Sequence, residues 1–298
     1  MQKSNLKNYI HLHFIVFIWG FTAVLGKLIT IHAVPLVWYR LSIASVLLFL
    51  FLILKKINFK VDLKTLMQFA IVGFIIGLHW LTFFYAIKIS NVSITLATLA
   101  TGALFTSILE PLLLKTKIKP YEIILSFLTI IGIVVIFNVE PQYGLGIIFA
   151  LISAFLSAIF AVINADFITK HDANVISFYE LLFAVLLITI IILFQNGFSL
   201  EFFNLSTKDW IYIFILGSVC TAYALTASTK LLKKITPFTM MLTVNLEPVY
   251  GIILALIVFG NEEKMSPSFY YGAILIFLGV ILNGIIKSKI KKSKEQQI

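Results

Sequence analysis

Charged side chains are scarce in this chain. Of its 298 residues, 12% are charged and 60% are apolar, whereas a typical soluble domain carries about 25% charged residues. The longest polar connection, residues 195–209, has about fifteen residues and is too short to fold as a separate domain. This composition excludes a soluble globular protein and indicates an integral membrane protein whose function lies inside the bundle.

Motifs for several kinds of chemistry are also absent. The single Cys220 excludes an intramolecular disulfide and a cysteine metal cluster, and we expect it to pack as a small buried hydrophobe. The sequence has no G-x-x-x-x-G-K-[ST] loop for an ATP-driven pump and no H-E-x-x-H or nucleophile–base site for an intramembrane hydrolase. We therefore expect no enzyme, no cofactor and no bound metal.

What the sequence does contain is a series of long apolar runs. A membrane-spanning helix needs about 20 apolar residues. Ten runs have about this length, and they predict an all-α integral membrane protein with ten transmembrane helices: residues 10–30, 35–54, 66–87, 92–114, 121–138, 144–165, 174–195, 209–231, 236–259 and 268–286.

The positive charge is distributed on one side of these spans. The chain carries a net charge of +10, but alternate connections hold 18 of the 23 basic residues, so membrane topology explains the charge without nucleic acid. The positive-inside rule then places both termini in the cytoplasm. The 18 residues are Lys3, Lys7, Lys55, Lys56, Lys60, Lys64, Lys115, Lys117, Lys119, Lys170, Lys230, Lys233, Lys234, Lys287, Lys289, Lys291, Lys292 and Lys294.

The two halves of the chain repeat one another. Residues 118–136 align with 265–283 so that Pro120 matches Pro267 and Gly132 matches Gly279. Similar offsets persist upstream, which predicts a first repeat at 1–140 and a second at 141–298. Each repeat has five spans, an odd number, so the second must enter the membrane from the opposite side. Inverted repeats of this kind are a hallmark of secondary transporters.

Several segments also carry a family resemblance. In order, they are "IWGFTAVLGK" (18–27), the Pro35, Tyr39 and Arg40 pattern, "LHWLTFFYAIKISNVS" (78–93), "LEPVYG" (246–251) and "GAILIFLGVIL" (272–282). Together with the ten-span pattern, they resemble the EamA-like branch of the drug/metabolite transporter superfamily. The resemblance implies a ten-helix, two-repeat carrier that moves small organic solutes, often amino acids or metabolites, outward across a bacterial inner membrane.

The strongest candidate for a functional residue is Glu247. It lies near the middle of the ninth span, where a carboxylate is costly and is usually retained for function. Pro248 follows it and removes a backbone hydrogen bond, which predicts a helix break beside the nearby amide of Asn245. Glu247 could exchange a proton or a substrate ammonium group during transport, and the alternative is a structural carboxyl bonded to another span.

Other polar and aromatic side chains are candidates for the pathway. Trp19, His79 and Trp80 could line a pocket that stacks rings and donates hydrogen bonds, with Tyr179 and Tyr223 on the same wall; ordinary packing is the alternative. Arg40 could receive an anionic substrate group near the outer vestibule, and the alternatives are a structural salt bridge and an anchor to lipid headgroups. Its repeat partner, Glu180, is expected too far away for a direct bond.

The resulting functional hypothesis is an alternating-access secondary transporter that exports a small organic solute. The alternatives are an uptake permease of the same fold and a channel or non-transporting membrane protein. The expected partners are a small-molecule substrate and membrane lipids. Coupling to protons, the identity of the substrate and the oligomeric state are left open by the sequence.

Overall fold

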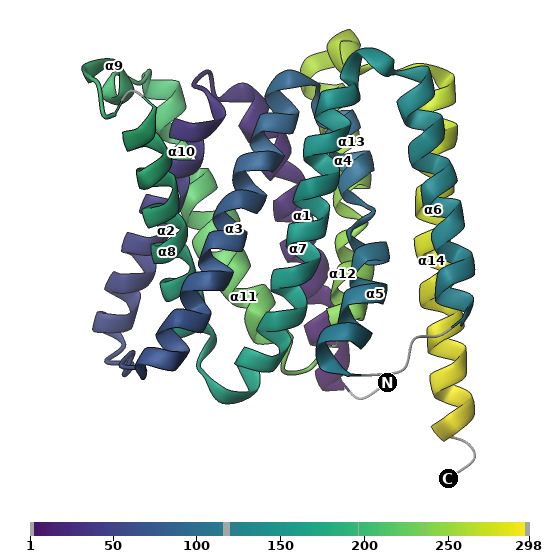
Figure 1. Cartoon of the computed structure of the whole chain (residues 1–298), viewed down its shortest axis with the longest axis horizontal. Helices are drawn as coiled ribbons and strands as arrows, with labels where there is room; N and C mark the ends of the chain where they lie inside the picture. Colours follow the sequence, from purple (N-terminus) through teal and green to yellow (C-terminus); the bar gives the residue numbers. More distant parts are fainter. Residues whose placement is uncertain (1–2, 116–119, 196, 236, 296–298) are drawn as a thin grey trace.

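The computed structural model describes residues 3–115, 120–195, 197–235 and 237–295, and these residues form a bundle of helices (Figure 1). The first half contains α1 (Lys3–Leu28), α2 (Ala33–Leu54), α3 (Leu63–Ile89), α4 (Val92–Leu99), α5 (Gly102–Leu114) and α6 (Pro120–Val139). The second half contains, after a short turn η1 (Pro141–Tyr143), α7 (Gly144–Lys170), α8 (Ala173–Phe194), α9 (Leu200–Phe203), α10 (Thr207–Gly217), η2 (Ser218–Tyr223), α11 (Ala224–Leu231), α12 (Pro237–Val244), α13 (Glu247–Phe259), η3 (Gly260–Glu263) and α14 (Pro267–Glu295).

These helices account for the ten predicted spans. Within the described residues, seven stretches are long and apolar enough to cross a membrane: 6–28, 33–54, 63–89, 92–114, 141–170, 173–194 and 207–231. The remaining three spans are α6, the divided pair α12 and α13, and α14. The span of residues 92–114 is also divided, into α4 and α5, and the span of 207–231 contains the π-helical segment η2.

Local sequence signals set the ends of several helices. Asp62, Asn91, Asp172 and Ser206 each precede a helix and accept a hydrogen bond from a backbone N–H of its first turn, which satisfies a group that has no partner within the helix. α6 and α14 each begin on a proline. Proline is well suited to the first turn because its missing N–H would have no intrahelical partner there.

The inverted repeat is visible in the course of the chain. α1 starts at the lower end of the bundle in Figure 1, α6 finishes at the upper end, and α7 starts from the upper end. The two repeats also interlock in equivalent ways, because α1 packs on α13 as α7 packs on α5, and α2 packs on α10 as α8 packs on α3. This arrangement confirms the predicted fold class.

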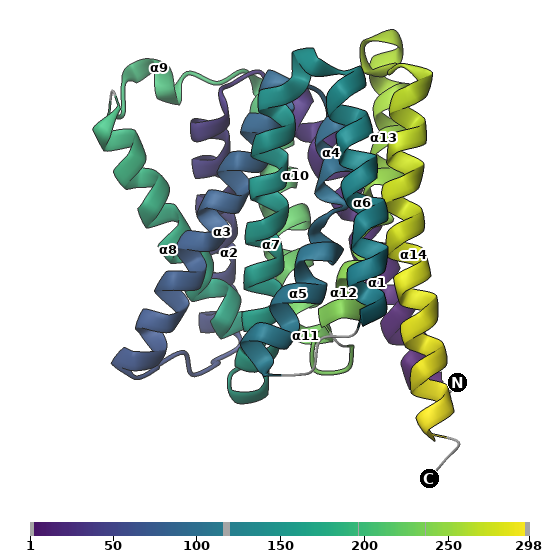
Figure 2. The same cartoon turned by 45° about the vertical axis from the view of Figure 1, so that its right-hand side comes forward.

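The last helices of the two repeats, α6 and α14, lie side by side at one edge of the bundle (Figures 1 and 2). They approach closely at Gly132 and Gly272, where a Cβ on Gly132 would lie 2.6 Å from the carbonyl oxygen of Gly272. Small residues allow such close backbone contact between membrane helices. The remaining helices form the body that surrounds the candidate site.

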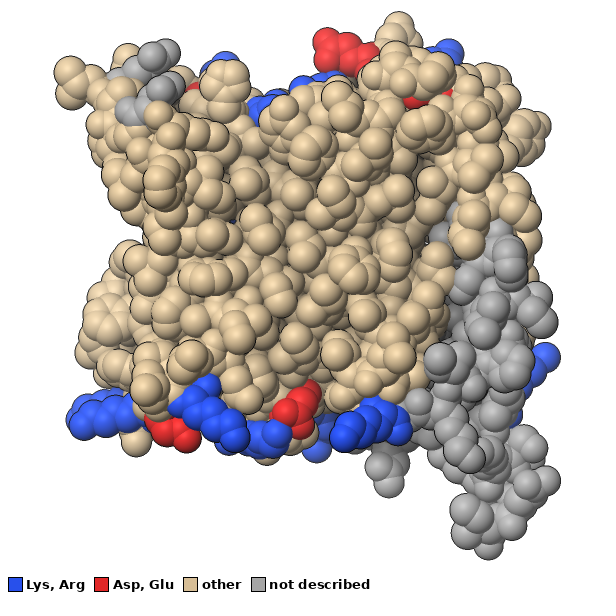
Figure 3. Space-filling view, viewed as in Figure 1, with Lys and Arg blue, Asp and Glu red and all other residues tan. Residues whose placement is uncertain are grey.

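On the face that Figure 3 shows, charged side chains lie mainly at the two ends of the bundle, with a broad uncharged belt between them. The lower end in this view carries most of the charge. Its exposed lysines are Lys7, Lys55, Lys56, Lys60, Lys64, Lys115, Lys170, Lys230, Lys233, Lys234 and Lys289, and we call this end the lysine-rich face. Lys117, Lys119 and the side chains of Lys3 and most of the C-terminal lysines lie outside the described residues.

Candidate substrate-binding cavity

Span nine is divided next to Glu247. Asn245 and Leu246 separate α12 from α13, and Leu246 closes a tighter turn in which its N–H donates to the carbonyl of Thr243 at 3.0 Å. Glu247 is the first residue of α13, and Pro248 is the second. The positive end of the α13 dipole therefore adjoins the Glu247 carboxyl, an arrangement that favours negative charge.

Span four is divided at the equivalent point of the first repeat. Ala100 and Thr101 separate α4 from α5, and an offset of 146 pairs Thr101 with Glu247. The two divided spans lie side by side, because α4 packs on α13 and α5 packs on α12, and a Cβ on Gly102 would lie 3.1 Å from the terminal methyl group of Met241 in α12. Irregular backbone inside a membrane is tolerated where it is buried in protein or borders a cavity.

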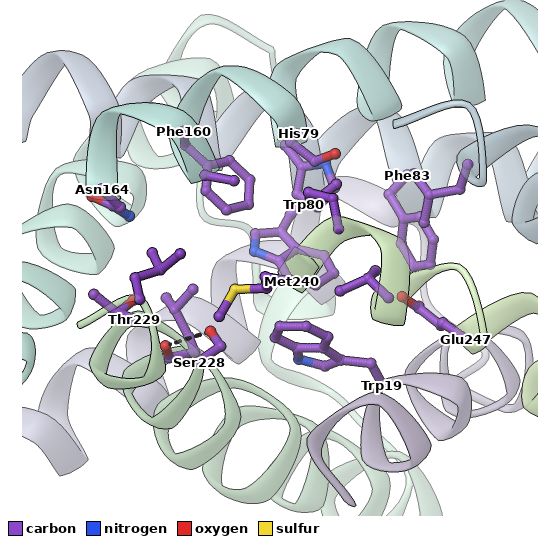
Figure 4. Close-up of a pocket in the computed structure, with 17 residues that line it drawn as sticks. Trp19, His79, Trp80, Phe83, Phe160, Asn164, Ser228, Thr229, Met240 and Glu247 are labelled. Atoms are coloured by element: carbon purple, nitrogen blue, oxygen red, sulfur yellow. Dashed lines mark hydrogen bonds between the residues drawn. The ribbon is translucent and has the colours of Figure 1, made fainter. Parts of the chain in front are cut away.

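A cavity lies beside the break in span nine (Figure 4). Its empty volume is about 770 Å³ when the part that is open to solvent is included. Its aromatic walls come from Trp19 on α1, Trp80 and Phe83 on α3, and Phe160 on α7. Its polar groups are His79, Ser157, Asn164, Ser228, Thr229 and Glu247. An apolar cavity with a few convergent polar groups is the usual form of a small-molecule site.

The cavity extends from the middle of the bundle toward the lysine-rich face. Trp19 and Glu247 lie near the middle of their spans, whereas Leu232 follows the end of α11 and directly precedes the exposed Lys233. Met240 and Met241 on α12 line the stretch between these levels. Methionine is flexible and can adjust to ligands of different shape.

The opposite face is closed by a buried carboxylate. Glu263, which is 0% exposed, accepts hydrogen bonds from Lys27 Nζ at 3.0 Å, Val92 N at 3.0 Å, and Ser93 N and Oγ at 2.9 Å each. Lys27 also lies 3.3 Å from Glu262. These contacts join α1, the start of α4 and η3 at the face opposite the lysine-rich face. We call this set of contacts the Glu263 closure.

His79 is held in one orientation by α7. Its Nδ1 lies 2.9 Å from the carbonyl oxygen of Ser153, and Ser153 Oγ lies 3.1 Å from the carbonyl oxygen of His79. A carbonyl only accepts hydrogen bonds, so this geometry fits an imidazole that carries its proton on Nδ1 and leaves Nε2 as an acceptor. Its ring also contacts Trp80, with 4.6 Å between the ring centroids.

Arg40 lies behind the cavity wall instead of lining it. It is 0% exposed, and its Nε donates to Thr221 Oγ1 at 2.6 Å. Among the described residues, its two terminal nitrogens have no hydrogen-bond partner. Glu247 and the buried Cys220 lie near enough to interact with it electrostatically. Thr221 and Cys220 belong to η2, and π-helical segments occur frequently at functional sites.

Trp19, His79, Trp80 and Glu247 are thus brought together around one cavity, while other candidates lie elsewhere. The Tyr179 hydroxyl donates to the carbonyl of Phe59 at 2.9 Å. The Tyr223 hydroxyl lies 2.8 Å from His11 Nε2 at an exposed position. Neither tyrosine lines the cavity. Asn245 is buried at the helix break, and its Nδ2 has no partner among the described residues.

Several cavity residues were not selected from the sequence. Asn164 and Ser157 on α7 and Ser228 and Thr229 on α11 line the cavity, but single small polar residues in apolar helices are common and gave no distinct signal. Asn164 carried the best available clue, because an amide that is buried within a membrane-spanning helix needs a partner. In the structure its Nδ2 donates to Glu180 Oε2 at 3.2 Å.

Two broken helices that meet at the centre of an inverted repeat are a feature of membrane carriers. Comparison with known proteins identifies the family. The model of the EamA-like transporter family matches residues 7–138 and 144–285, and the chain belongs to this family. It is therefore a multi-pass membrane protein of a transporter family.

Individual relatives agree with this assignment. An uncharacterized transporter of Clostridium kluyveri is 28% identical over 218 residues, which cover 67% of this chain and 65% of the relative. An uncharacterized transporter of Synechocystis sp. is 25% identical over 223 residues, which cover 71% and 63%. The matches therefore span slightly less than two thirds of these relatives. One crystal structure shares the fold, with a TM-score of 0.69 and 14% identity over 94% of this chain and 98% of that one.

Proposed function

We propose that this protein is a secondary transporter that exports small organic solutes, such as amino acids or related metabolites, by alternating access. The observation that carries the proposal is the pairing of an aromatic cavity on the side of the lysine-rich face with the Glu263 closure on the other side. A binding site that is closed on one side and extends toward the other has the geometry of one end state of a carrier.

The chemistry of the cavity favours solutes that contain an ammonium group. Among the described lining residues, Glu247 alone has a side chain that is formally charged at neutral pH. A carboxylate with indole rings nearby binds an ammonium group through charge and cation–π attraction. The buried indole N–H groups of Trp19 and Trp80 have no partner among the described residues, so they offer donors for an acceptor on the solute.

The orientation we propose follows the distribution of lysine. The lysine-rich face would lie in the cytoplasm of a bacterial inner membrane, with both chain termini on the same side. The cavity would then receive solute from the cytoplasm, as export requires. Reporter fusions after Lys60 and Lys119 should report the cytoplasm, and fusions near Ser90 and Gln142 the outside. A cytoplasmic signal at Gln142 would contradict both the orientation and the assignment of direction.

Transport can be tested with purified protein in lipid vesicles. A panel of amino acids, amines and neutral analogues would be assayed with and without a pH gradient. We expect saturable flux of one or more solutes with an ammonium group, and a loss of at least about tenfold, or 1.4 kcal/mol, in apparent affinity in Glu247→Gln. Glu262→Gln is the matched control, since its side chain is 73% exposed at the opposite face.

The same assay separates the alternatives. Non-saturating flux that does not respond to a gradient would indicate a channel. Gradient-driven movement of solute from the face opposite the lysine-rich face to the lysine-rich face would indicate an uptake permease. Full transport by Glu247→Gln would show that its charge is not needed and that the residue is a structural carboxyl.

A further inference from the structure

A second buried carboxyl, Glu180 on α8, lies behind the cavity wall. Glu180 is 0% exposed and Asn164 is 2% exposed. The Asn164 Nδ2 donates to Glu180 Oε2 at 3.2 Å. The other two oxygens of the pair, Asn164 Oδ1 and Glu180 Oε1, are both buried without a hydrogen-bond partner among the described residues. One pair of side chains therefore contains two unsatisfied buried acceptors.

This pattern has a simple chemical reading. A carboxylate and an amide oxygen can only accept, so neither of the two unpartnered oxygens can satisfy the other. A protonated carboxyl instead has an O–H donor. An amide and a protonated carboxyl can form two hydrogen bonds, one in each direction, and the structure already contains one of them. A single proton on Glu180 Oε1 would supply the second through donation to Asn164 Oδ1.

We propose that Asn164 and Glu180 form a proton-binding site in the wall of the transport cavity, separate from Glu247. On binding, Glu180 Oε1 takes a proton from a hydronium ion in the cavity, which leaves a water molecule, and donates it in a hydrogen bond to Asn164 Oδ1. On release, the proton passes to a water molecule, which becomes hydronium, and the second hydrogen bond is lost. The inference rests on the proposed transport function for its role, which would be to couple solute movement to a proton gradient.

The position of Asn164 gives protons a route to the site. Asn164 lines the cavity, and Figure 4 shows it on the same side as Thr229 and Ser228 of α11. Glu180 itself does not line the cavity. The helix behind it is tightly packed, because a Cβ on Gly73 of α3 would lie 2.5 Å from the Glu180 carbonyl oxygen. Solvent therefore reaches Glu180 from the side of Asn164.

The electrostatic surroundings leave the carboxyl without a permanent counter-ion. The charged and titratable side chains on the helices that pack against α8 are Tyr39 and Arg40 of α2, Lys64, His79, Tyr85 and Lys88 of α3, Asp166 and Lys170 of α7, and Lys230 of α11, with Tyr179 on α8 itself. Of the described side chains, Asn164 alone bonds to Glu180. Asp166 instead pairs with Lys170 at 2.6 Å. Burial without a cation favours the neutral, protonated carboxyl.

Ser177 supports the same site. It lies one helical turn before Glu180 on α8, is 0% exposed, and its Oγ has no partner among the described residues. Residues three apart lie on the same face of a helix. A hydroxyl and two acceptor oxygens could also hold a small metal cation such as Na⁺, so the test has to distinguish sodium from protons.

The experiment needs no substrate. Infrared difference spectra of the purified protein in detergent, recorded over a pH series, would follow the C=O stretch of buried protonated carboxyls. We expect Glu180→Gln to lose one titrating carboxyl band relative to wild type. Asn164→Leu should keep that band but shift its frequency, because the hydrogen bond to the carboxyl is removed. Glu247→Gln should leave the Glu180 band in place.

The outcomes are distinct. Glu180→Asp keeps a carboxyl that is too short for the same contact, so it tests the site if the Gln variant does not fold; we expect its band to shift as in Asn164→Leu. Spectra of Glu180→Gln that titrate as wild type would overturn the proposal. So would loss of the Glu180 band on adding NaCl, relative to choline chloride, at constant pH, which would indicate a sodium site. None of these readouts depends on transport, so the transport proposal is tested separately.

Discussion

The guanidinium carbon of Arg40 lies 3.4 Å from the centroid of the Trp80 ring. Arg40, the one arginine of the sequence, is therefore stacked on the ring of Trp80, and Trp80 itself lines the cavity. The ring of Phe84 also contacts the Arg40 guanidinium, with 5.2 Å between its ring centroid and the guanidinium carbon. Arg40 thus acts on the cavity through Trp80 and through its charge, and it has no direct contact with the cavity space.

The first prediction is that Arg40→Lys lowers stability. A guanidinium is planar, stacks on aromatic rings and carries a separate Nε donor, whereas an ammonium cannot stack in this way. Loss of the stacked cation–π contact and of the bond to Thr221 should cost about 1–3 kcal/mol. Thermal unfolding in detergent would measure the loss. Lys208→Arg, at an exposed position, is the control and should have no effect; an equally small effect of Arg40→Lys would contradict the stacking argument.

The second prediction concerns the aromatic wall. His79→Ala and Trp80→Ala should each weaken solute transport while the protein still inserts into the membrane, because both side chains line the cavity. Removal of a stacking ring or an imidazole acceptor should reduce apparent affinity by roughly tenfold, or about 1.4 kcal/mol. Tyr223→Phe is the control, since Tyr223 lies outside the cavity. Unchanged transport in both cavity variants would assign His79 and Trp80 to packing.

The third prediction concerns the divided helix. Pro248→Ala restores an N–H, so α12 and α13 can join through a bond to the carbonyl of Val244. Since Pro248 lies in the first turn of α13, stability should change by less than about 1 kcal/mol, whereas transport should fall because the break is lost. Pro237→Ala provides the comparison, as Pro237 also begins a helix but lies away from the break. If both variants transported equally, the break would have no role.

The fourth prediction concerns the Glu263 closure. Glu263→Ala removes the partner of Lys27 and of the first N–H groups of α4, and removal of one partner of a buried ion pair costs about 3–5 kcal/mol. Glu262→Ala removes an exposed contact and should cost at most about 1 kcal/mol. Unfolding temperatures and hydrogen exchange of residues 91–99 would compare them. Equal exchange in these two variants would show that Glu263 does not hold this face closed.

The sequence predicted the fold well because membrane helices are specified by simple physical rules. Apolar length gave the ten spans, and the offset between repeats gave their inverted order. Pro248 predicted a helix break, and the observed break at Asn245 and Leu246 lies two to three residues before this proline. The equivalent break at Ala100 and Thr101 has no proline beside it, so no local signal marked it and only the repeat alignment could have done so.

The candidate site was less predictable because it depends on which helix faces meet. Glu247, Trp19, His79 and Trp80 stood out by chemistry and depth. The link between Asn164 and Glu180 joins side chains 16 residues apart on two helices, and neither position has a pattern that specifies its partner. Tyr179 and Tyr223 are aromatic residues with a polar group, as expected of a cavity wall. The rotation of their helices instead directs their hydroxyls to Phe59 and His11.

Cys220 has a practical consequence for work on this protein. It is the chain's single thiol and is 2% exposed, so thiol-reactive dyes and spin labels should find almost no background target in the folded wild-type protein. A cysteine introduced at Lys64, or at Lys208 on the opposite face, would then be the one accessible label. The wild-type chain itself can therefore serve as the unlabelled reference when movements of the two faces are followed.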